Sequence, residues 1–498
     1  MDLKAVHNQF RETLVRLYSS RHDEDTTSVS RGVPPFLLRD VLSAGPLRAY
    51  IPTEYGGRGG HISDGLGILD TACYHSLSLG LTLGINGALF LQPTSKYGDA
   101  DAKRRILPRF AGGGALGGLM ITEPDFGSDA LGMQTSWTEK GDGFHVSGTK
   151  HWGGLTGWAD YWLITARQRT DSGSLRPGID LFIAEQDDPD QHIDVEERYN
   201  ALGLYGIPYG RNRIDITVPG ENRLGGGKRG VGMLLDTLHR SRIQFPGMAV
   251  GFIRRMVDEA VNHCRQRVVG RTALIEYDQV RARIAELQGR LVTVMAMGHW
   301  ASENASLDLE LSRLSAPANA IKTVATDFMH QAADSLLQLV GATGYRLDHI
   351  AGRSLVDSRP FQIFEGSNDI LYEQLALSNI KEMRKTGEFN LLRHLADNPL
   401  TARAAELLGS HIDRDVPEAP DQRVSVALGR IISRVVGVDM TLALGNTSIP
   451  DDWIESAISL LRREISKFTV DLTNDRIVDV IPTSLDNRFW LGADPTGS

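Results

Sequence analysis

The segment with the most chemical potential runs from Met120 to Asp129 and reads MITEPDFGSD. Its first residues suit a strand, and the Pro, Asp, Gly and Ser that follow suit a turn. Thr122 and Ser128 offer hydroxyl groups, and the turn at Gly127 exposes backbone N–H groups. This combination is suited to binding a polar heterocycle or a phosphate. Taken alone, the same residues also fit an ordinary polar turn.

A second segment, FQIFEGSNDI from Phe361 to Ile370, contains Glu365 shortly before a predicted helix start. A lone glutamate is normally a solvated surface group, so a functional role requires support from the residues around it. If Glu365 is buried, its pKa rises, whereas the dipole of a helix starting near Ser367 and Asp369 partly opposes that rise. A carboxylate in such a setting can act as a general base.

Two segments match the pattern G-x-G-x-x-G, one at residues 112–117 and the other at residues 225–230. A dinucleotide-binding fingerprint lies between a strand and a helix of a βαβ unit. The first segment instead follows a predicted helix and leads into a strand, and the strand pattern before the second breaks at Pro219. We interpret both as loops. The two cysteines, Cys73 and Cys264, lack the spacing of a disulfide framework or a zinc motif, so no metal site is expected.

The elements that must position these residues follow a helical, β, helical order. Up to about Gly114 the chain shows helical spacing with short breaks, whereas after Leu116 apolar residues alternate at period two, as at Ile214, Ile216 and Val218. Helical spacing then returns. The order predicts an α+β fold with an N-terminal helical domain at residues 1–115, a middle β-domain at 116–231, a helical bundle at 232–385 and a C-terminal extension at 386–498.

The extension carries Ile454, Ile458, Leu461 and Ile465 on one helical face and no residues that indicate chemistry. We expect it to be helical and to pack on the bundle or on a neighbouring subunit.

Composition excludes several classes of function. The net charge of -9 and the pI near 5.9 provide no basic surface for nucleic acid or an anionic membrane. No apolar run approaches the roughly 18 residues of a membrane span, and the N-terminus suits an amphipathic helix better than a signal peptide. Few cysteines suit a reducing compartment, so we expect a cytoplasmic protein.

Five segments, in chain order, resemble the motifs of the acyl-CoA dehydrogenase family. MITEPDFGSD resembles its flavin-binding TEPxxGSD motif, and GTKHW at residues 148–152 resembles its G-x-K-x-W. Arg242 resembles the arginine of the substrate-facing helix. Arg267 and the QLVGATG run at residues 338–344 resemble elements that reach the adenosine half of FAD on a partner subunit. The FQIFEGSNDI segment resembles the one that carries the catalytic glutamate. The resemblance covers about residues 1–384 and leaves the extension outside it.

The resemblance implies a middle domain that is β-barrel-like, a C-terminal four-helix bundle, one FAD between them, and Glu365 as the catalytic base. It implies cofactor contacts from Met120, Thr122, Gly127, Ser128, Trp152, Gly154, Arg267, Gln338, Gly341, Ser367 and Asp369. It implies substrate contacts from Ser128, His239, Arg242 and Gly366.

Three positions depart from the family pattern. Gly154 stands where the family usually has a threonine that contacts the flavin, and His239 replaces an acidic residue near the substrate. Some members carry the catalytic glutamate directly before the helix arginine, but Ser241 in that position cannot be the base. The departures bear on flavin tuning and substrate identity.

The expected reaction is therefore α,β-dehydrogenation of an acyl thioester, carried by CoA or by a carrier protein, to the trans-2-enoyl thioester. The resemblance further implies a homo-oligomer, a dimer or a tetramer, and an electron-transferring flavoprotein as acceptor. Two alternatives stay open: a related flavin oxidase or monooxygenase, for which Gly154 leaves room, and a non-catalytic flavoprotein scaffold.

Overall fold

A computed structural model describes residues 2–20, 33–227 and 230–473. The N-terminal part is helical, as predicted. In α1 the side chains of Phe10, Leu14 and Leu17 recur at helical spacing and are buried, which anchors the helix on the domain core. The helices are α1 (Leu3–Ser20), α3 (Pro35–Ser43), α4 (Ile62–His75), α5 (Leu77–Gly84), the π-helix η3 (Ile85–Leu91), α6 (Gln92–Tyr97) and α7 (Ala100–Ala111).

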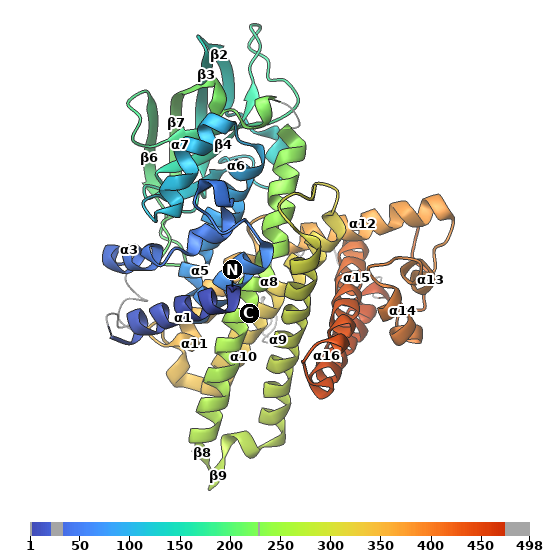
Figure 1. Ribbon diagram of the computed structural model, residues 1–498. Coiled ribbons are helices and arrows are strands. Elements are labelled where there is room, and N and C mark those ends of the chain that lie inside the picture. Colours follow the sequence, from blue (N-terminus) through green and yellow to red (C-terminus); the bar gives the residue numbers. More distant parts are fainter. Residues whose placement is uncertain (1, 21–32, 228–229, 474–498) are drawn as a thin grey trace, which may run out of the picture.

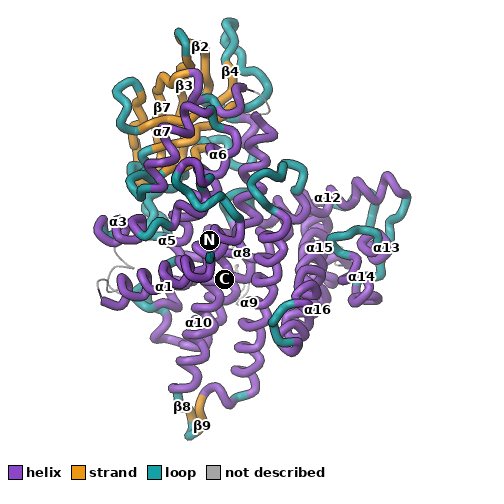
Figure 2. The backbone as a smooth tube through the Cα atoms, in the orientation of Figure 1, coloured by secondary structure: helices purple, strands orange, loops and turns teal. Residues whose placement is uncertain are grey.

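A curled seven-stranded sheet follows, drawn at the top of Figure 1 and orange in Figure 2. Strand β7 pairs antiparallel with both β3 and β6, and β4 pairs parallel with β1 and antiparallel with β5. Ile214, Ile216 and Val218 alternate on β7 and are buried, which confirms the period-two prediction. The strands are β1 (Gly117–Met120), β2 (Ser136–Lys140), β3 (Gly143–His151), β4 (Tyr161–Gln168), β5 (Asp180–Glu185), β6 (Gln191–Arg198) and β7 (Gly210–Pro219).

Long helices then form the bundle that extends away from the sheet (Figure 1). On α10, Val324, Phe328 and Leu336 recur at helical spacing and are fully buried, and the helix is followed by Gly341 with a left-handed φ of 75°. The elements are α8 (Gly230–Gln266), the short strands β8 (Val268–Val269) and β9 (Thr272–Ala273), α9 (Asp278–Asn304), α10 (Ser315–Val340), α11 (Ile350–Ser358) and α12 (Asn368–Thr386).

The C-terminal extension is helical and packs on the bundle, one of the two arrangements expected from sequence. Helix α15 packs against α9, α10 and α12, and α16 packs against α9 and α15. The face of α16 with Ile458, Leu461 and Ile465 is buried. These helices are α13 (Leu391–Ala396), α14 (Ala402–Leu408), α15 (Gln422–Ala443) and α16 (Asp451–Thr473). Residues 474–498 of the predicted extension lie outside the described part of the chain.

The two glycine-rich segments are loops, as interpreted from sequence. Residues 112–116 lie between α7 and β1, and Gly225 and Gly226 of the second segment are in the left-handed region that a turn requires, whereas residues 228–229 lie outside the described part of the chain. Among the described helices, none combines the length and apolar character that crossing a bilayer requires.

Candidate active site

A cavity of about 270 Å³ lies where the sheet, the N-terminal helices, α8 and the start of α12 meet. Apolar side chains from α5, η3, α8 and α12 form much of its wall, a common composition for a ligand site. Residues from segments far apart in the sequence face it together. The predicted site residues that line it are Thr122, Gly127, Ser128, Trp152, Gly154, Arg242, Glu365 and Gly366.

The Glu365 side chain is held at one carboxylate oxygen and open at the other. The hydroxyl of Ser241 donates to Oε1 at 2.9 Å, whereas Oε2 is buried with no hydrogen-bond partner among the described residues. Burial raises the pKa of Glu365, and Ser241, Arg242 and Lys322 oppose that rise. A buried, unpaired carboxylate oxygen on a cavity wall has the properties of a proton acceptor.

The Glu365 backbone is in the left-handed region, with a φ of 55°, and Gly366 follows with a φ of 92°. Arg242 fixes this turn, since its Nε and Nη2 donate to the Glu365 carbonyl oxygen at 3.0 and 2.7 Å. Lys322 donates to the Gly366 carbonyl at 2.9 Å, and burial lowers the pKa of Lys322 to about 7. Non-glycine residues adopt such a conformation only where neighbouring groups determine it, which is common at functional sites.

On the sheet side, a buried ion pair fixes the TEPDFGSD turn. Lys150 of β3 donates to Glu123 Oε1 and to the Ile121 carbonyl, both at 2.9 Å. Glu123 also accepts from the backbone N–H groups of Gln134 and Thr135. Burial lowers the pKa of Lys150 to about 8, although Glu123 favours its charged form. These contacts hold the turn against the sheet, and nothing in the sequence pattern alone indicates them.

The same side of the cavity fits a planar ring with polar edges. The Trp152 side chain is 53% exposed although large aromatic groups are usually buried, and it packs against Tyr199 with ring centroids 4.6 Å apart. A Cβ on Gly127 would meet no atom within 4 Å, so open space lies above the turn. Together with the unpaired Glu365 oxygen, these features fit the ring of a flavin.

Four predicted site residues do not line this cavity. Met120 is buried in β1, and its carbonyl accepts from the Thr165 hydroxyl. His239 is buried on α8, where its Nδ1 is 2.8 Å from the Leu311 carbonyl oxygen. Ser367 is the N-cap of α12, and the exposed Asp369 side chain pairs with Arg430 of α15 at 3.0 Å. None of these four side chains lines the cavity, so their predicted contacts with FAD or substrate stay predictions.

Three further predicted residues, Arg267, Gln338 and Gly341, are exposed near the opposite end of the bundle. Arg267 follows the last residue of α8, 25 residues after Arg242, and at 1.5 Å per helical residue the two are about 38 Å apart. These residues do not line the cavity of their own chain, and their predicted contacts with FAD stay predictions. A contact with a cofactor would require a second subunit.

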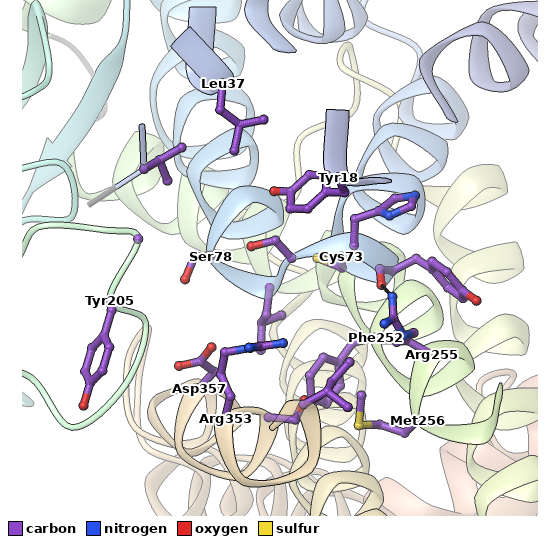
Figure 3. Close-up of a pocket in the computed structure, with 18 of the residues that line it drawn as sticks. Tyr18, Leu37, Cys73, Ser78, Tyr205, Phe252, Arg255, Met256, Arg353 and Asp357 are labelled. Atoms are coloured by element: carbon purple, nitrogen blue, oxygen red, sulfur yellow. Dashed lines mark hydrogen bonds between the residues drawn. The ribbon is translucent and has the colours of Figure 1, made fainter. Parts of the chain in front are cut away.

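A smaller cavity of about 70 Å³ lies between α4, α8 and α11 and shares no lining residue with the first (Figure 3). Asp357 on its wall accepts from the Leu204 backbone N–H, and burial raises the Asp357 pKa to about 6. This volume is too small for a flavin ring. Within the described ranges no group of His, Cys, Asp and Glu side chains could hold a metal ion, and both cysteines are free and buried.

Comparison with known proteins identifies the family. Three family models match: "Acyl-CoA dehydrogenase, N-terminal domain" at residues 4–114, "middle domain" at 118–216 and "C-terminal domain" at 228–378. An acyl-CoA dehydrogenase of Bacillus subtilis is 27% identical over 68% of this chain and 87% of its own length. Across several curated relatives, the matched region makes up between 57% and 94% of the relative's length.

Two solved structures share the fold. Butyryl-CoA dehydrogenase from Megasphaera elsdenii has a TM-score of 0.66 at 23% identity and covers 76% of this chain and 96% of that one. An acyl-CoA dehydrogenase complexed with FAD from Bacillus anthracis has a TM-score of 0.74 at 19% identity, with 95% of this chain and 89% of that one covered. The second alignment therefore reaches into the C-terminal extension. The chain belongs to the acyl-CoA dehydrogenase family and is an FAD-dependent oxidoreductase of acyl thioesters.

Proposed function

We propose that this protein converts an acyl thioester to the trans-2-enoyl thioester, with Glu365 removing the α-proton. The observation that supports this proposal most directly is that the two oxygens of the Glu365 carboxylate have different surroundings. One oxygen is held by Ser241, and the other is buried, unpaired and on the wall of the cavity. Burial raises the pKa of Glu365, which makes it a stronger base than a solvated glutamate.

When bound, FAD supplies an acceptor for the hydride that leaves the substrate β-carbon. Thr122, Gly127, Ser128 and Trp152 would hold its ring against the sheet side of the cavity. Glu365 Oε2 then takes the α-proton from the opposite side, and the electrons of the α C–H bond form the new double bond as the hydride leaves.

The backbone N–H of Glu365 is a candidate donor to the thioester oxygen. It has no acceptor within the described part of the chain, and Arg242 restrains the backbone of this residue by binding the Glu365 carbonyl oxygen in the next peptide unit. A donor that is already oriented stabilises negative charge as it develops on that oxygen. The base and the donor would thus come from one residue, and Arg242 would act by positioning it.

The partners form part of the same proposal. The substrate is an acyl-CoA or the thioester of an acyl carrier protein, and an electron-transferring flavoprotein reoxidises the enzyme. We further propose a homo-oligomer in which Arg267, Gln338 and Gly341 contact FAD bound mainly by a neighbouring subunit. Their exposure at the far end of the bundle supports this arrangement.

The direct test is anaerobic reduction of the purified protein by CoA and carrier-protein thioesters with 4 to 16 acyl carbons. Acid precipitation should release FAD, and at least one thioester should bleach the flavin absorbance. Bleaching with slow reaction toward O₂ supports a dehydrogenase, whereas rapid aerobic formation of peroxide would indicate the oxidase alternative. Binding of every thioester class without bleaching would refute the proposed activity and favour a non-catalytic flavoprotein.

A further inference from the structure

The turn that carries Glu365 is hydrogen-bonded at both ends to one partly buried carboxylate, that of Asp327. Gln362, three residues before Glu365, donates from Nε2 to Asp327 Oδ1 at 2.8 Å. Asn368, three residues after Glu365, donates from Nδ2 to the same oxygen at 2.7 Å. Asp327 lies on α10, so both flanks of the turn are attached to this helix through one side chain.

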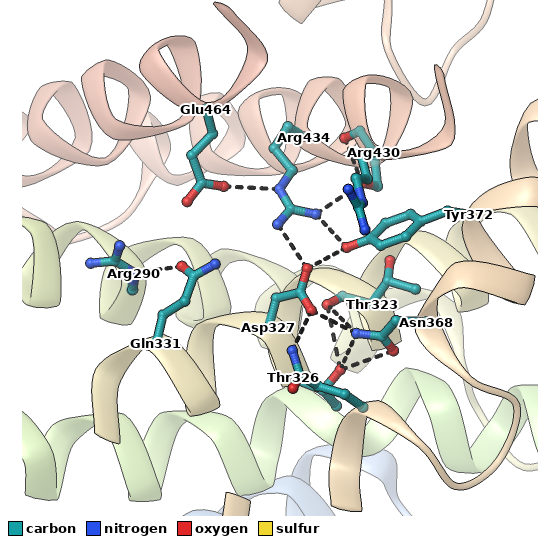
Figure 4. Close-up of polar contacts among 12 residues, drawn as sticks. Arg290, Thr323, Thr326, Asp327, Gln331, Asn368, Tyr372, Arg430, Arg434 and Glu464 are labelled. Carbon is teal, nitrogen blue, oxygen red and sulfur yellow. Dashed lines mark hydrogen bonds and ion pairs between the residues drawn. The ribbon is translucent and has the colours of Figure 1, made fainter. Parts of the chain in front are cut away.

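The second oxygen of Asp327 is paired with an arginine side chain of the C-terminal extension (Figure 4). Arg434 of α15 donates from Nη2 to Asp327 Oδ2 at 3.0 Å, and the hydroxyl of Tyr372 donates to that oxygen at 2.6 Å. The Arg434 side chain is fully buried and also pairs with Glu464 of α16 at 2.9 Å. The matched family models end at residue 378, so Arg434 and Glu464 lie beyond them.

Asp327 needs this cation to remain an acceptor at both oxygens. Burial alone would raise the Asp327 pKa, but Arg434 and the hydrogen bonds from Tyr372 and Gln362 hold it below its usual value. Without the cation, an unpaired Asp327 carboxylate would turn toward other donors, and Gln362 and Asn368 would lose their shared acceptor. The Glu365 turn, with two successive left-handed residues, would then lose the contacts that fix its ends.

We propose that Arg434, supplied by the C-terminal extension, is a positioning residue for the catalytic base and acts on Glu365 through Asp327. The extension is thereby part of the catalytic machinery and not only a cover for the bundle. This inference rests on the proposed role of Glu365. A buried ion pair by itself need not stabilise the fold. The role of Arg434 is inferred from Gln362 and Asn368, which flank Glu365 and both donate to Asp327.

The test compares full-length, FAD-loaded wild type with Arg434→Met, using the thioester that bleaches the wild-type flavin fastest among acyl-CoA and acyl-carrier-protein thioesters of 4 to 16 carbons. A catalytic base that is misplaced by about 1 Å abstracts its proton far more slowly. The anaerobic rate of flavin reduction should therefore fall roughly 10- to 100-fold. The Kd from the spectral shift on thioester binding should stay within about twofold, because the cavity wall outside the Glu365 turn keeps its contacts with the thioester.

Arg403→Met is the matched control. Arg403 of α14 pairs at 2.6 Å with Asp439, whose side chain is 3% exposed, and neither residue bonds to the Glu365 turn. This variant should lower the melting temperature and leave the reduction rate at the wild-type value. An equal loss of rate in both variants, or a wild-type rate in Arg434→Met, would overturn the proposal.

Two further variants keep the test decisive if Arg434→Met fails to fold. Gln362→Met breaks the bond to Asp327 at the start of the turn, together with the exposed bond from Arg359 to Gln362 Oε1, and should lower the reduction rate with FAD retained. The double variant Arg434→Met/Asp327→Asn removes the unpaired charge but keeps an Oδ1 acceptor, so it should recover rate relative to Arg434→Met. A wild-type rate in Gln362→Met contradicts the proposal. Reduction of Glu365→Gln at the wild-type rate would instead reject the role of Glu365, which separates the two failures.

Discussion

At the scale of single residues, the chemistry depends on one carboxylate whose two oxygens have different surroundings. Glu365→Gln keeps the side-chain volume and the backbone N–H but cannot accept a proton at Oε2. Loss of a general base typically lowers a rate 10²- to 10⁴-fold, or about 3 to 5 kcal/mol in the barrier. We expect the thioester to shift the flavin spectrum normally and to bleach it far more slowly in anaerobic stopped-flow measurements. Wild-type bleaching would place proton abstraction elsewhere.

Ser241 gives a prediction for pH dependence. Its hydrogen bond to Glu365 Oε1 opposes the rise in pKa that burial causes, so Ser241→Ala should raise the Glu365 pKa further. The base works when ionised, and the rate therefore falls as pH drops through that pKa. We expect the acid limb of the reduction-rate profile to move to higher pH, with rates approaching wild type at alkaline pH.

Thr237→Val is the matched control for Ser241→Ala. Thr237 lies one turn earlier on α8, and its buried hydroxyl donates to the Met233 carbonyl without contacting Glu365. Its profile should keep the wild-type acid limb. If Ser241→Ala also keeps it, the hydrogen bond does not tune the base.

Much of the cavity wall was predictable because its motifs are distinctive in sequence, as for Thr122, Trp152 and Glu365. The donor role of Ser241 was missed, since that residue was judged only as a base and its partner is 124 positions away. The partners of His239 and Asp369 likewise depend on tertiary packing. At Gly154 a Cβ would lie 2.7 Å from Ile85 Cδ1, so a larger residue there would require the end of the Ile85 side chain to move.

At the scale of elements, local periodicity sufficed for the helical and β regions, because apolar spacing reports one buried face. It did not reveal that α8 continues for 37 residues, from the cavity to the β8–β9 hairpin. That length separates Arg242 from Arg267, which directly follows the helix, so the two arginines cannot contact the same cavity. Nor did it reveal the network in which Arg434 of α15 joins Asp327 of α10 and Glu464 of α16.

Arg267→Ala tests the far end of α8. A guanidinium facing a pyrophosphate contributes charge-assisted hydrogen bonds, so its loss should weaken FAD binding roughly tenfold or more. The exposed side chain leaves no cavity in the core, so the melting temperature of the apoprotein should not change. FAD content after gel filtration measures the effect, with Arg265→Ala, exposed two residues earlier, as control. Full FAD retention in Arg267→Ala would argue against the contact.

At the scale of the whole molecule, the extension and the bundle form one hydrophobic core with buried charges inside it. Helices α15 and α16 pack against α9, whose other neighbours include α8 and α10. The expectation that the extension packs on the bundle followed from its amphipathic face. Its connection to the Glu365 turn did not, because an isolated arginine in a helical pattern does not indicate its partner.

The proposed assembly can be tested with a hetero-oligomer of two different defective subunits. A Glu365→Gln subunit, which lacks the base, is co-expressed with an Arg267→Ala subunit, which lacks a proposed FAD contact, and the two carry different tags. If Arg267 contacts FAD on the neighbouring subunit, the Arg267→Ala subunit keeps its own Glu365 and receives an intact Arg267 from its partner. That site is then complete, whereas the other site lacks both groups and should lose its FAD. After gel filtration the mixed dimer should keep about one FAD per two subunits, and that flavin should be reduced at the wild-type rate. If Arg267 acted within its own chain, the retained FAD would lie in the Glu365→Gln subunit and no fast phase would appear. Anaerobic stopped-flow on the doubly purified species distinguishes the two results, with each parent homo-oligomer as control.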